Sequence, residues 1–196
     1  MTKKYNSVLI IGMGLIGSSI SRALVENHVA NSVYGLDTND KIIKKCHDLN
    51  LLVQGETNLK NFDLQFDLII ICTPLSAYKN IFSSLSDFIS QPTLITDVGS
   101  TKMSTISDFK KAVTNNNITF VPSHPIAGLE KSGPEYGFSK LFDNRYCILT
   151  PYEKNDAATS SITEMWKSIG MTVELMEADR HDRVLAMTSH IPQLIA

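Results

Sequence analysis

The sequence predicts an α/β fold built around a doubly wound, mostly parallel sheet. Short β-branched segments alternate with amphipathic helical segments along most of the 196 residues. Several of the strand segments are almost continuously apolar, and a glycine-rich turn follows the first of them. Such alternation is typical of βαβ units, whose parallel strands are covered by helices on both faces.

The predicted strands are short and separated by turn residues. DLIIICTP (67–74), for example, is nearly all apolar, as expected for a strand buried on both faces. The strands are expected at residues 7–12, 32–37, 67–74, 93–98, 118–123, 146–151 and 172–177.

The predicted helices show one apolar face each. LIGSSISRALVENH (15–28) and SAYKNIFSSLSDFIS (76–90) have the three-to-four residue spacing of an amphipathic helix. The segment 178–196 predicts another helix, with Asp179 as N-cap, whose apolar pattern still continues at Ala196. We therefore expect a nucleotide-binding domain at 1–177 and, at 178–196, the start of a truncated C-terminal helical domain.

Composition excludes several classes of protein. Apolar residues make up 43% and charged residues 19%, and the formal net charge of −2 argues against a nucleic-acid binder. Three widely spaced cysteines without a CxxC pair favour neither a zinc site nor a disulfide framework. No signal peptide, transmembrane segment or metal site is expected, so the sequence predicts a cytoplasmic protein with free thiols.

GMGLIG (12–17) is a G-x-G-x-x-G pattern placed between the first strand and the first helix. In a Rossmann-type domain the first glycine forms the tight turn, the second lets the backbone approach a pyrophosphate, and the third allows close packing. Asp37 ends the second strand, where a carboxylate accepts hydrogen bonds from a ribose 2′-OH, so NAD is favoured over NADP. The alternative is a glycine turn that only packs strand on helix.

Two later loops are expected at the same edge of the sheet, because ligands bind beyond the carboxyl ends of parallel strands. Thr73 and Pro74 follow the third strand, and Ser100 follows the fourth. Both positions have a structural alternative, a strand-ending turn for the first and a helix N-cap for Ser100. The residues expected to bind the cofactor are Gly12, Met13, Gly14, Leu15, Ile16, Gly17, Asp37, Thr73, Pro74 and Ser100.

The histidines differ in their surroundings. His28, His47 and His181 are expected at the surface, and His190 could serve either packing or ligand contact. His124 is expected in a loop after a strand, between Pro122 and Pro125, where a neutral imidazole could take a proton from a substrate hydroxyl. A rigid surface loop is the alternative explanation.

Several motifs together resemble the prephenate/arogenate (cyclohexadienyl) dehydrogenase family of tyrosine biosynthesis. They are GMGLIGSS, DVGSTK, SHPIAGLEKSGP, RYCILTP and the late HD and SHIP segments, which occur in this order across essentially the whole chain. The resemblance implies an NAD-dependent oxidative decarboxylation of prephenate or arogenate. It assigns His124 as the base that takes the C4 hydroxyl proton while hydride leaves C4, and Ser100 as the residue that helps hold that hydroxyl.

The resemblance also implies a substrate pocket shaped by Glu130 and His190, a full-length homodimer, and a helical domain that supplies an arginine for a substrate carboxylate. Two positions depart from the family pattern: Leu129 stands where threonine is common, and Gln193 where a second histidine is common. A 3-hydroxyacid dehydrogenase and a non-catalytic NAD-binding module remain alternatives. The first would place a catalytic lysine in the helical domain, and the second would need neither Ser100 nor His124.

Overall fold

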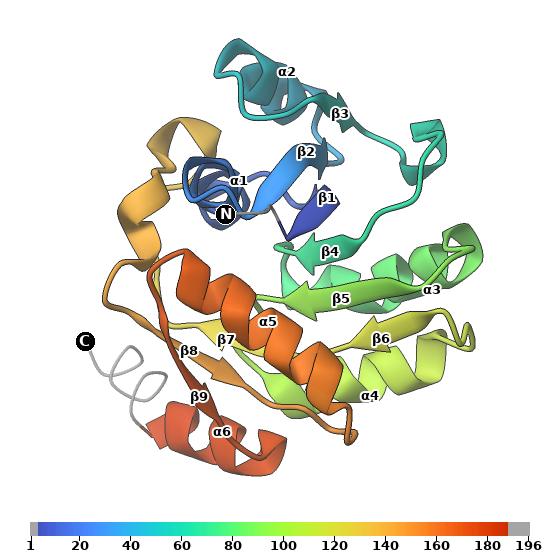
Figure 1. Cartoon of the computed structure of the whole chain (residues 1–196), viewed down its shortest axis with the longest axis vertical. Helices are drawn as coiled ribbons and strands as arrows, with labels where there is room; N and C mark the ends of the chain where they lie inside the picture. Colours follow the sequence, from blue (N-terminus) through green and yellow to red (C-terminus); the bar gives the residue numbers. More distant parts are fainter. Residues whose placement is uncertain (1–3, 188–196) are drawn as a thin grey trace.

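A computed structural model describes residues 4–187 of the chain. Six parallel strands form the large sheet in the order β3-β2-β1-β4-β5-β6 (Figure 1). This is the doubly wound arrangement that the sequence predicts. The strands are β1 (Tyr5–Ile11), β2 (Ala30–Leu36), β3 (Gln54–Glu56), β4 (Leu68–Ile71), β5 (Thr93–Asp97) and β6 (Ile118–Phe120).

Three further strands form a second, smaller sheet in the order β7-β8-β9. They are β7 (Ser123–Pro125), β8 (Tyr146–Leu149) and β9 (Thr172–Leu175). β7 runs antiparallel to β8, whereas β8 and β9 are parallel. The last two predicted strands are therefore present, but they extend a separate sheet.

Helices cover both faces of the large sheet (Figure 1). Val8 and Ile10 point toward the cluster that contains α1 and α5, while their neighbours Leu9 and Ile11 point toward the cluster that contains α3 and α4. This alternation explains the continuous apolar strands, since both faces are buried. The helices are α1 (Leu15–Glu26), α2 (Asp40–Asp48), α3 (Tyr78–Phe88), α4 (Lys102–Ala112), α5 (Asp156–Ser168) and α6 (Ala178–Leu185).

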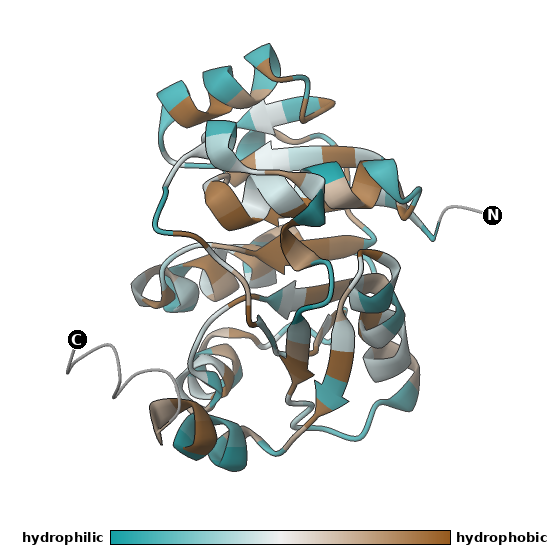
Figure 2. Ribbon diagram, turned by 90° about the vertical axis from the view of Figure 1, so that its left-hand side faces the viewer, coloured by the Kyte–Doolittle hydropathy of each residue, from teal (hydrophilic) through white to brown (hydrophobic). Residues whose placement is uncertain are grey.

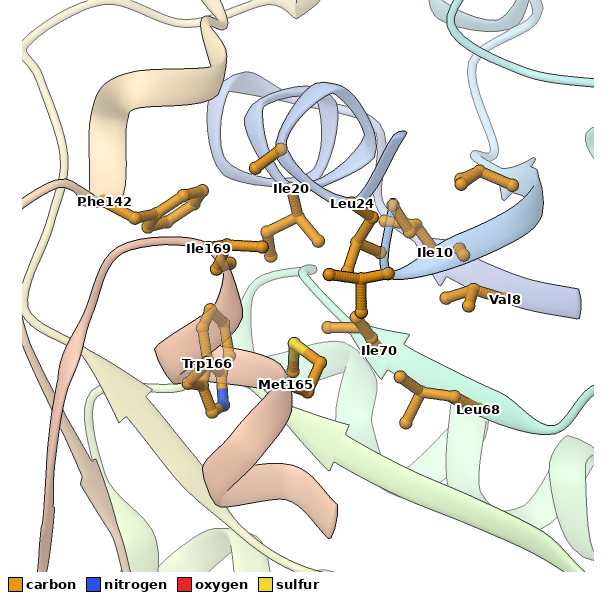
Figure 3. Packing of buried hydrophobic residues seen from close by; sticks show 14 of the residues in the cluster. Val8, Ile10, Ile20, Leu24, Leu68, Ile70, Phe142, Met165, Trp166 and Ile169 are labelled. Carbon is orange, nitrogen blue, oxygen red and sulfur yellow. The ribbon is translucent and has the colours of Figure 1, made fainter. Parts of the chain in front are cut away.

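Trp166 on α5 anchors the first cluster (Figure 3). Its side chain is fully buried and meets Phe142 edge to face at 6.0 Å between ring centroids. Met165 and Ile169 of the same helical segment face Leu24 and Ile20 of α1 and the strands beneath them (Figure 3). Hydrophobic residues are concentrated in the central strands, while outer helix faces are hydrophilic (Figure 2).

The predicted strand 118–123 is wrong as one element, because β6 ends at Phe120 and β7 begins at Ser123 in the other sheet. Pro122 has no N–H to continue the ladder, and its carbonyl instead accepts from Thr150 N at 3.0 Å. β3 was not predicted, because Gln54–Glu56 is short and lacks the apolar pattern of a strand.

The N-cap predicted for the last helix is also wrong. Glu177 precedes α6, and Asp179 lies inside its first turn, where it pairs with Arg183 one turn later. The expected helix beyond residue 187 lies outside the described residues. Within residues 4–187, no helix is long and apolar enough to cross a membrane.

Candidate active site

The glycine loop between β1 and α1 has two glycines that the fold itself requires. Gly12 adopts φ of +95°, and a Cβ placed there would lie 2.7 Å from the Cys72 carbonyl oxygen. A Cβ on Gly17 would collide with the Gly12 carbonyl oxygen. The tight turn and the close packing expected of the first and third glycines are therefore present.

Gly14 differs, because a Cβ placed there meets nothing within 4 Å. It is the N-cap of α1 and offers no side chain, so the first N–H groups of the helix face this open space. Backbone amides and the positive end of a helix dipole form a natural site for phosphate groups. Close by, Thr73 lies against the loop and its buried Oγ1 has no hydrogen-bond partner within the described part of the chain.

Asp37 directly follows β2 and lies beside the glycine loop. Its carboxylate accepts hydrogen bonds from Met13 N at 2.9 Å and from Asn39 N at 3.0 Å. These bonds fix the carboxylate next to the loop at the carboxyl end of the sheet, which is the position expected for a ribose-binding acid.

A buried carboxylate at the end of β5 links the segments that carry Ser100 and His124. Asp97 accepts hydrogen bonds from Gly99 N at 2.9 Å and from Ser123 N at 3.0 Å. It also forms a fully buried ion pair with Lys102, 2.6 Å long, while Lys102 Nζ donates to the Ser123 carbonyl. Burial lowers the pKa of Lys102, and the Asp97 carboxylate opposes that effect.

His124 lies within β7, opposite Ile148 of β8, so the expectation of a loop position is wrong. Its Nδ1 is 2.9 Å from Nε2 of His181. The surface position predicted for His181 is also wrong, since this residue is fully buried in α6. Sequence reasoning missed it because its first-turn position in a polar helix gives no sign of what that helix packs against.

Asp182 completes this row of side chains. Its Oδ1 is 2.8 Å from His181 Nδ1 and accepts from Lys102 N at 2.8 Å, while Oδ2 accepts from Met103 N at 2.9 Å. Asp182 thus supplies the side-chain cap of α4, whose own N-cap is Thr101. The alternative that Ser100 is the N-cap is therefore wrong. Ser100 is half-buried just before this helix.

A cavity of about 490 Å³ opens beside His124. Glu130 and the exposed Leu129 line it, as does Arg145, which sequence reasoning missed. The structure therefore brings Glu130 and His124 together, as expected. His190 and Gln193 lie outside the described residues. Among residues 4–187, no group of three potential metal ligands is found. The cavity lining is His124, Pro125, Ile126, Ala127, Gly128, Leu129, Glu130, Arg145 and Leu185.

The parallel sheet, the glycine loop and Asp37 together define a dinucleotide-binding domain of the Rossmann type. Residues 20–175 match the sequence model of the family described as prephenate dehydrogenase, nucleotide-binding domain. The chain belongs to this family.

Relatives of known name support the same assignment. The chain is 35% identical over 193 residues to a cyclohexadienyl dehydrogenase of Zymomonas mobilis, covering 98% of this chain and 65% of that protein. It is 31% identical over 198 residues to a prephenate dehydrogenase of Bacillus subtilis, covering 100% and 53%. The chain thus spans between about half and two thirds of these relatives.

A solved structure has the same fold. The crystal structure of prephenate dehydrogenase from A. aeolicus, in complex with hydroxyphenyl propionate and NAD⁺, superposes with a TM-score of 0.90. The identity is 32%, and the match covers 97% of this chain and 66% of that one.

Proposed function

We propose that this chain is the cofactor-binding and catalytic part of an NAD-dependent enzyme that oxidatively decarboxylates prephenate, or its amino analogue arogenate. The observation that carries the proposal is the position of His124, which lines a cavity and is held through Ser123 and Asp97 next to the segment that bears Ser100. Membership of the family supports the same reaction.

The glycine loop fits a dinucleotide, because the space in front of Gly14 is open and the amides at the start of α1 face it. Asp37 would hold the adenosine ribose, while Thr73, Pro74 and Ser100 would line the crevice. When bound, NAD⁺ supplies the acceptor for the hydride that leaves C4 of the substrate. The NAD⁺ complex of the A. aeolicus relative supports this choice of cofactor.

His124 acts as the general base. It takes the proton of the C4 hydroxyl as that carbon becomes a carbonyl, and loss of CO₂ makes the ring aromatic. Aromatisation drives the reaction, so a base at a fixed position and a substrate held in the right orientation are sufficient. Ser100 orients the hydroxyl, and Glu130 shapes the substrate end of the cavity; the resemblance assigns the same role to His190.

We also propose how the chain is divided, how it assembles and in which compartment it works. Residues 1–177 form the NAD-binding unit, residues 178–196 begin a helical segment, and the functional protein is a homodimer, as the resemblance implies. The unpaired thiols of Cys46, Cys72 and Cys147 support a reducing compartment such as the cytoplasm.

Replacement of His124 tests the proposal. In the protein expressed with any residues that follow Ala196 in its gene, His124→Asn should lower kcat for prephenate or arogenate at least about 100-fold, because a general base is lost. NAD⁺ affinity, measured by calorimetry, should change less than about twofold. His28→Asn is the matched control, since His28 is exposed and its φ of 56° suits asparagine.

The outcomes separate the alternatives. Full activity of the His124→Asn protein would refute the assigned base. Oxidation of 3-hydroxyacids, but of neither prephenate nor arogenate, would favour the hydroxyacid dehydrogenase. NAD⁺ binding without any turnover would favour a non-catalytic binding module. Comparison of the rates with prephenate and arogenate identifies the substrate.

A further inference from the structure

β7, the strand that carries His124, is joined to helix α6 by a row of three side chains, His124, His181 and Asp182. Two short contacts connect them: 2.9 Å between the two imidazoles and 2.8 Å between His181 and the carboxylate. His181 is fully buried, and the side chain of Asp182 is 25% exposed. The row ends at the imidazole that lines the cavity.

The ionisation of Asp182 determines which atoms donate and which accept hydrogen bonds in this row. Burial alone would raise the pKa of Asp182, but the amides of Lys102 and Met103 and the ring of His181 outweigh it and lower the pKa. Asp182 is therefore ionised at neutral pH and can only accept. His181 must then carry a proton on Nδ1 and donate it to Asp182.

The second contact follows from the first. Burial lowers the pKa of His181, so its ring is neutral at pH 7 and Nε2 holds a lone pair. Nε2 of His181 can then only accept, and Nδ1 of His124 must be the donor at 2.9 Å. A neutral His124 that carries its proton on Nδ1 has its basic lone pair on Nε2.

We propose that His181 and Asp182 are positioning residues that fix the tautomer of His124, so that Nε2 is the nitrogen that accepts the substrate proton. When His124 takes that proton, it becomes an imidazolium whose Nδ1–H still donates to His181. The proton stays on His124, and the Asp182 carboxylate stabilises the new charge through the intervening ring. The catalytic step rests on the proposed function, whereas the tautomer does not.

Charged groups on neighbouring elements also act on the buried ring of His181. Lys102 on α4 lowers the pKa of His181, and Asp97 at the end of β5 raises it. His124 contacts the His181 ring from β7. Asp97 and Lys102 are themselves paired, so their net influence on the row is small. Asp182 is the carboxylate in direct contact with the ring.

Asp182→Ala tests the tautomer most directly. It removes the acceptor at Nδ1 of His181, so the proton of that ring is no longer held there and can move to Nε2. His181 would then donate to Nδ1 of His124 and leave the His124 proton on Nε2. We expect kcat to fall roughly 100- to 10,000-fold at pH 7.5, with KM and NAD⁺ affinity within about twofold.

Nuclear magnetic resonance gives a readout that does not depend on activity. Long-range ¹⁵N–¹H spectra of the histidine rings, recorded on the complete protein, should show Nδ1–H for His124 in the unmodified protein and a population with Nε2–H in Asp182→Ala. Asp179→Ala is the matched control, because Asp179 is an exposed carboxylate on the same helix that pairs only with Arg183 among the described contacts.

A second pair of variants keeps the test decisive if Asp182→Ala fails to fold. His181→Gln places an amide oxygen near Nε2 of the lost ring and can still accept from His124, so kcat should remain within about tenfold. His181→Leu offers no acceptor and should lower kcat at least about 100-fold. Nε2–H on His124 in the unmodified protein, or equal kcat values for the two variants, would overturn the proposal. Absence of turnover in the unmodified protein, with Nδ1–H on His124, would instead refute the proposed function alone.

Discussion

At the scale of single residues, the glycine loop separates structural from ligand-binding roles. Gly12 and Gly17 cannot carry a side chain without meeting backbone atoms, whereas Gly14 has open space in front of it. The φ of −71° at Gly14 is one that any residue adopts. Nothing in the fold therefore explains a glycine at this position, while a closely approaching phosphate does.

Two alanine substitutions in this loop should have opposite effects. Gly14→Ala should leave the free energy of unfolding within about 1 kcal/mol of the unmodified value, but weaken NAD⁺ binding at least about tenfold. Gly17→Ala should cost about 2 kcal/mol or more of stability, because its Cβ meets a backbone oxygen. Urea unfolding and calorimetric titration measure the two effects. Unchanged NAD⁺ affinity in Gly14→Ala would contradict the assigned phosphate site.

At the scale of elements, the chain leaves the large sheet after β6 and forms β7 in the second sheet. Ser123 at the start of β7 is held from three elements. Its Oγ lies 2.8 Å from Thr96 Oγ1 and accepts from Trp166 Nε1 at 3.1 Å, and its carbonyl accepts from Lys102 Nζ. These bonds fix the backbone next to His124.

The buried Lys102–Asp97 pair should be the most sensitive of these connections. Lys102→Met should lower the free energy of unfolding by about 3–5 kcal/mol, because it leaves the fully buried Asp97 carboxylate without its cation. Adding Asp97→Asn to this variant removes the unpaired charge and should recover part of the loss. Urea unfolding of both variants tests this. A loss below about 1 kcal/mol for Lys102→Met would show that this ion pair contributes little to the stability of the fold.

At the scale of the whole molecule, α6 contacts both α4, which covers the large sheet, and β7 of the small sheet. Asp182 binds the amides at the start of α4, and His181 reaches β7. The last described element is thus connected to both α4 and β7. Its docking depends on the ionisation of two side chains.

Stability should therefore fall in mildly acidic solution. The pKa of His181 is lowered from its ordinary value of 6.5, so below that pH the unfolded chain binds a proton that the folded protein does not. Stability is greatest above pH 6.5 and decreases as the pH falls toward the folded pKa. The lowered pKa of Asp182 adds a second loss below its ordinary value of 3.8.

Chemical denaturation at about pH 7.5 and about pH 5.5 measures the first of these losses. His181→Gln has no titrating ring, so its stability should change less between the two pH values than that of the unmodified protein. His47→Gln is the control, because His47 is exposed on α2 and should leave the pH dependence as it was. An equal pH dependence in His181→Gln would show that another group controls acid stability.

The sequence by itself determined the local features of this protein. Apolar periodicity predicted the large sheet, because buried parallel strands must be apolar on both faces. The glycine loop, Asp37 and Thr73 were found at the expected edge, since their spacing follows from a strand–turn–helix unit. Leu129, Glu130 and His124 share one cavity as expected, because they are close in the chain.

Only the tertiary structure decided what surrounds His124. His124 and His181 are 57 residues apart, and their contact depends on the chain crossing from β6 into a second sheet and on α6 returning across the start of α4. Pro122 marks the point where the large sheet must end, but no local pattern indicates which strand β7 pairs with next. His181 looked like a surface residue because local hydropathy describes a helix by itself, whereas burial is set by what packs against it.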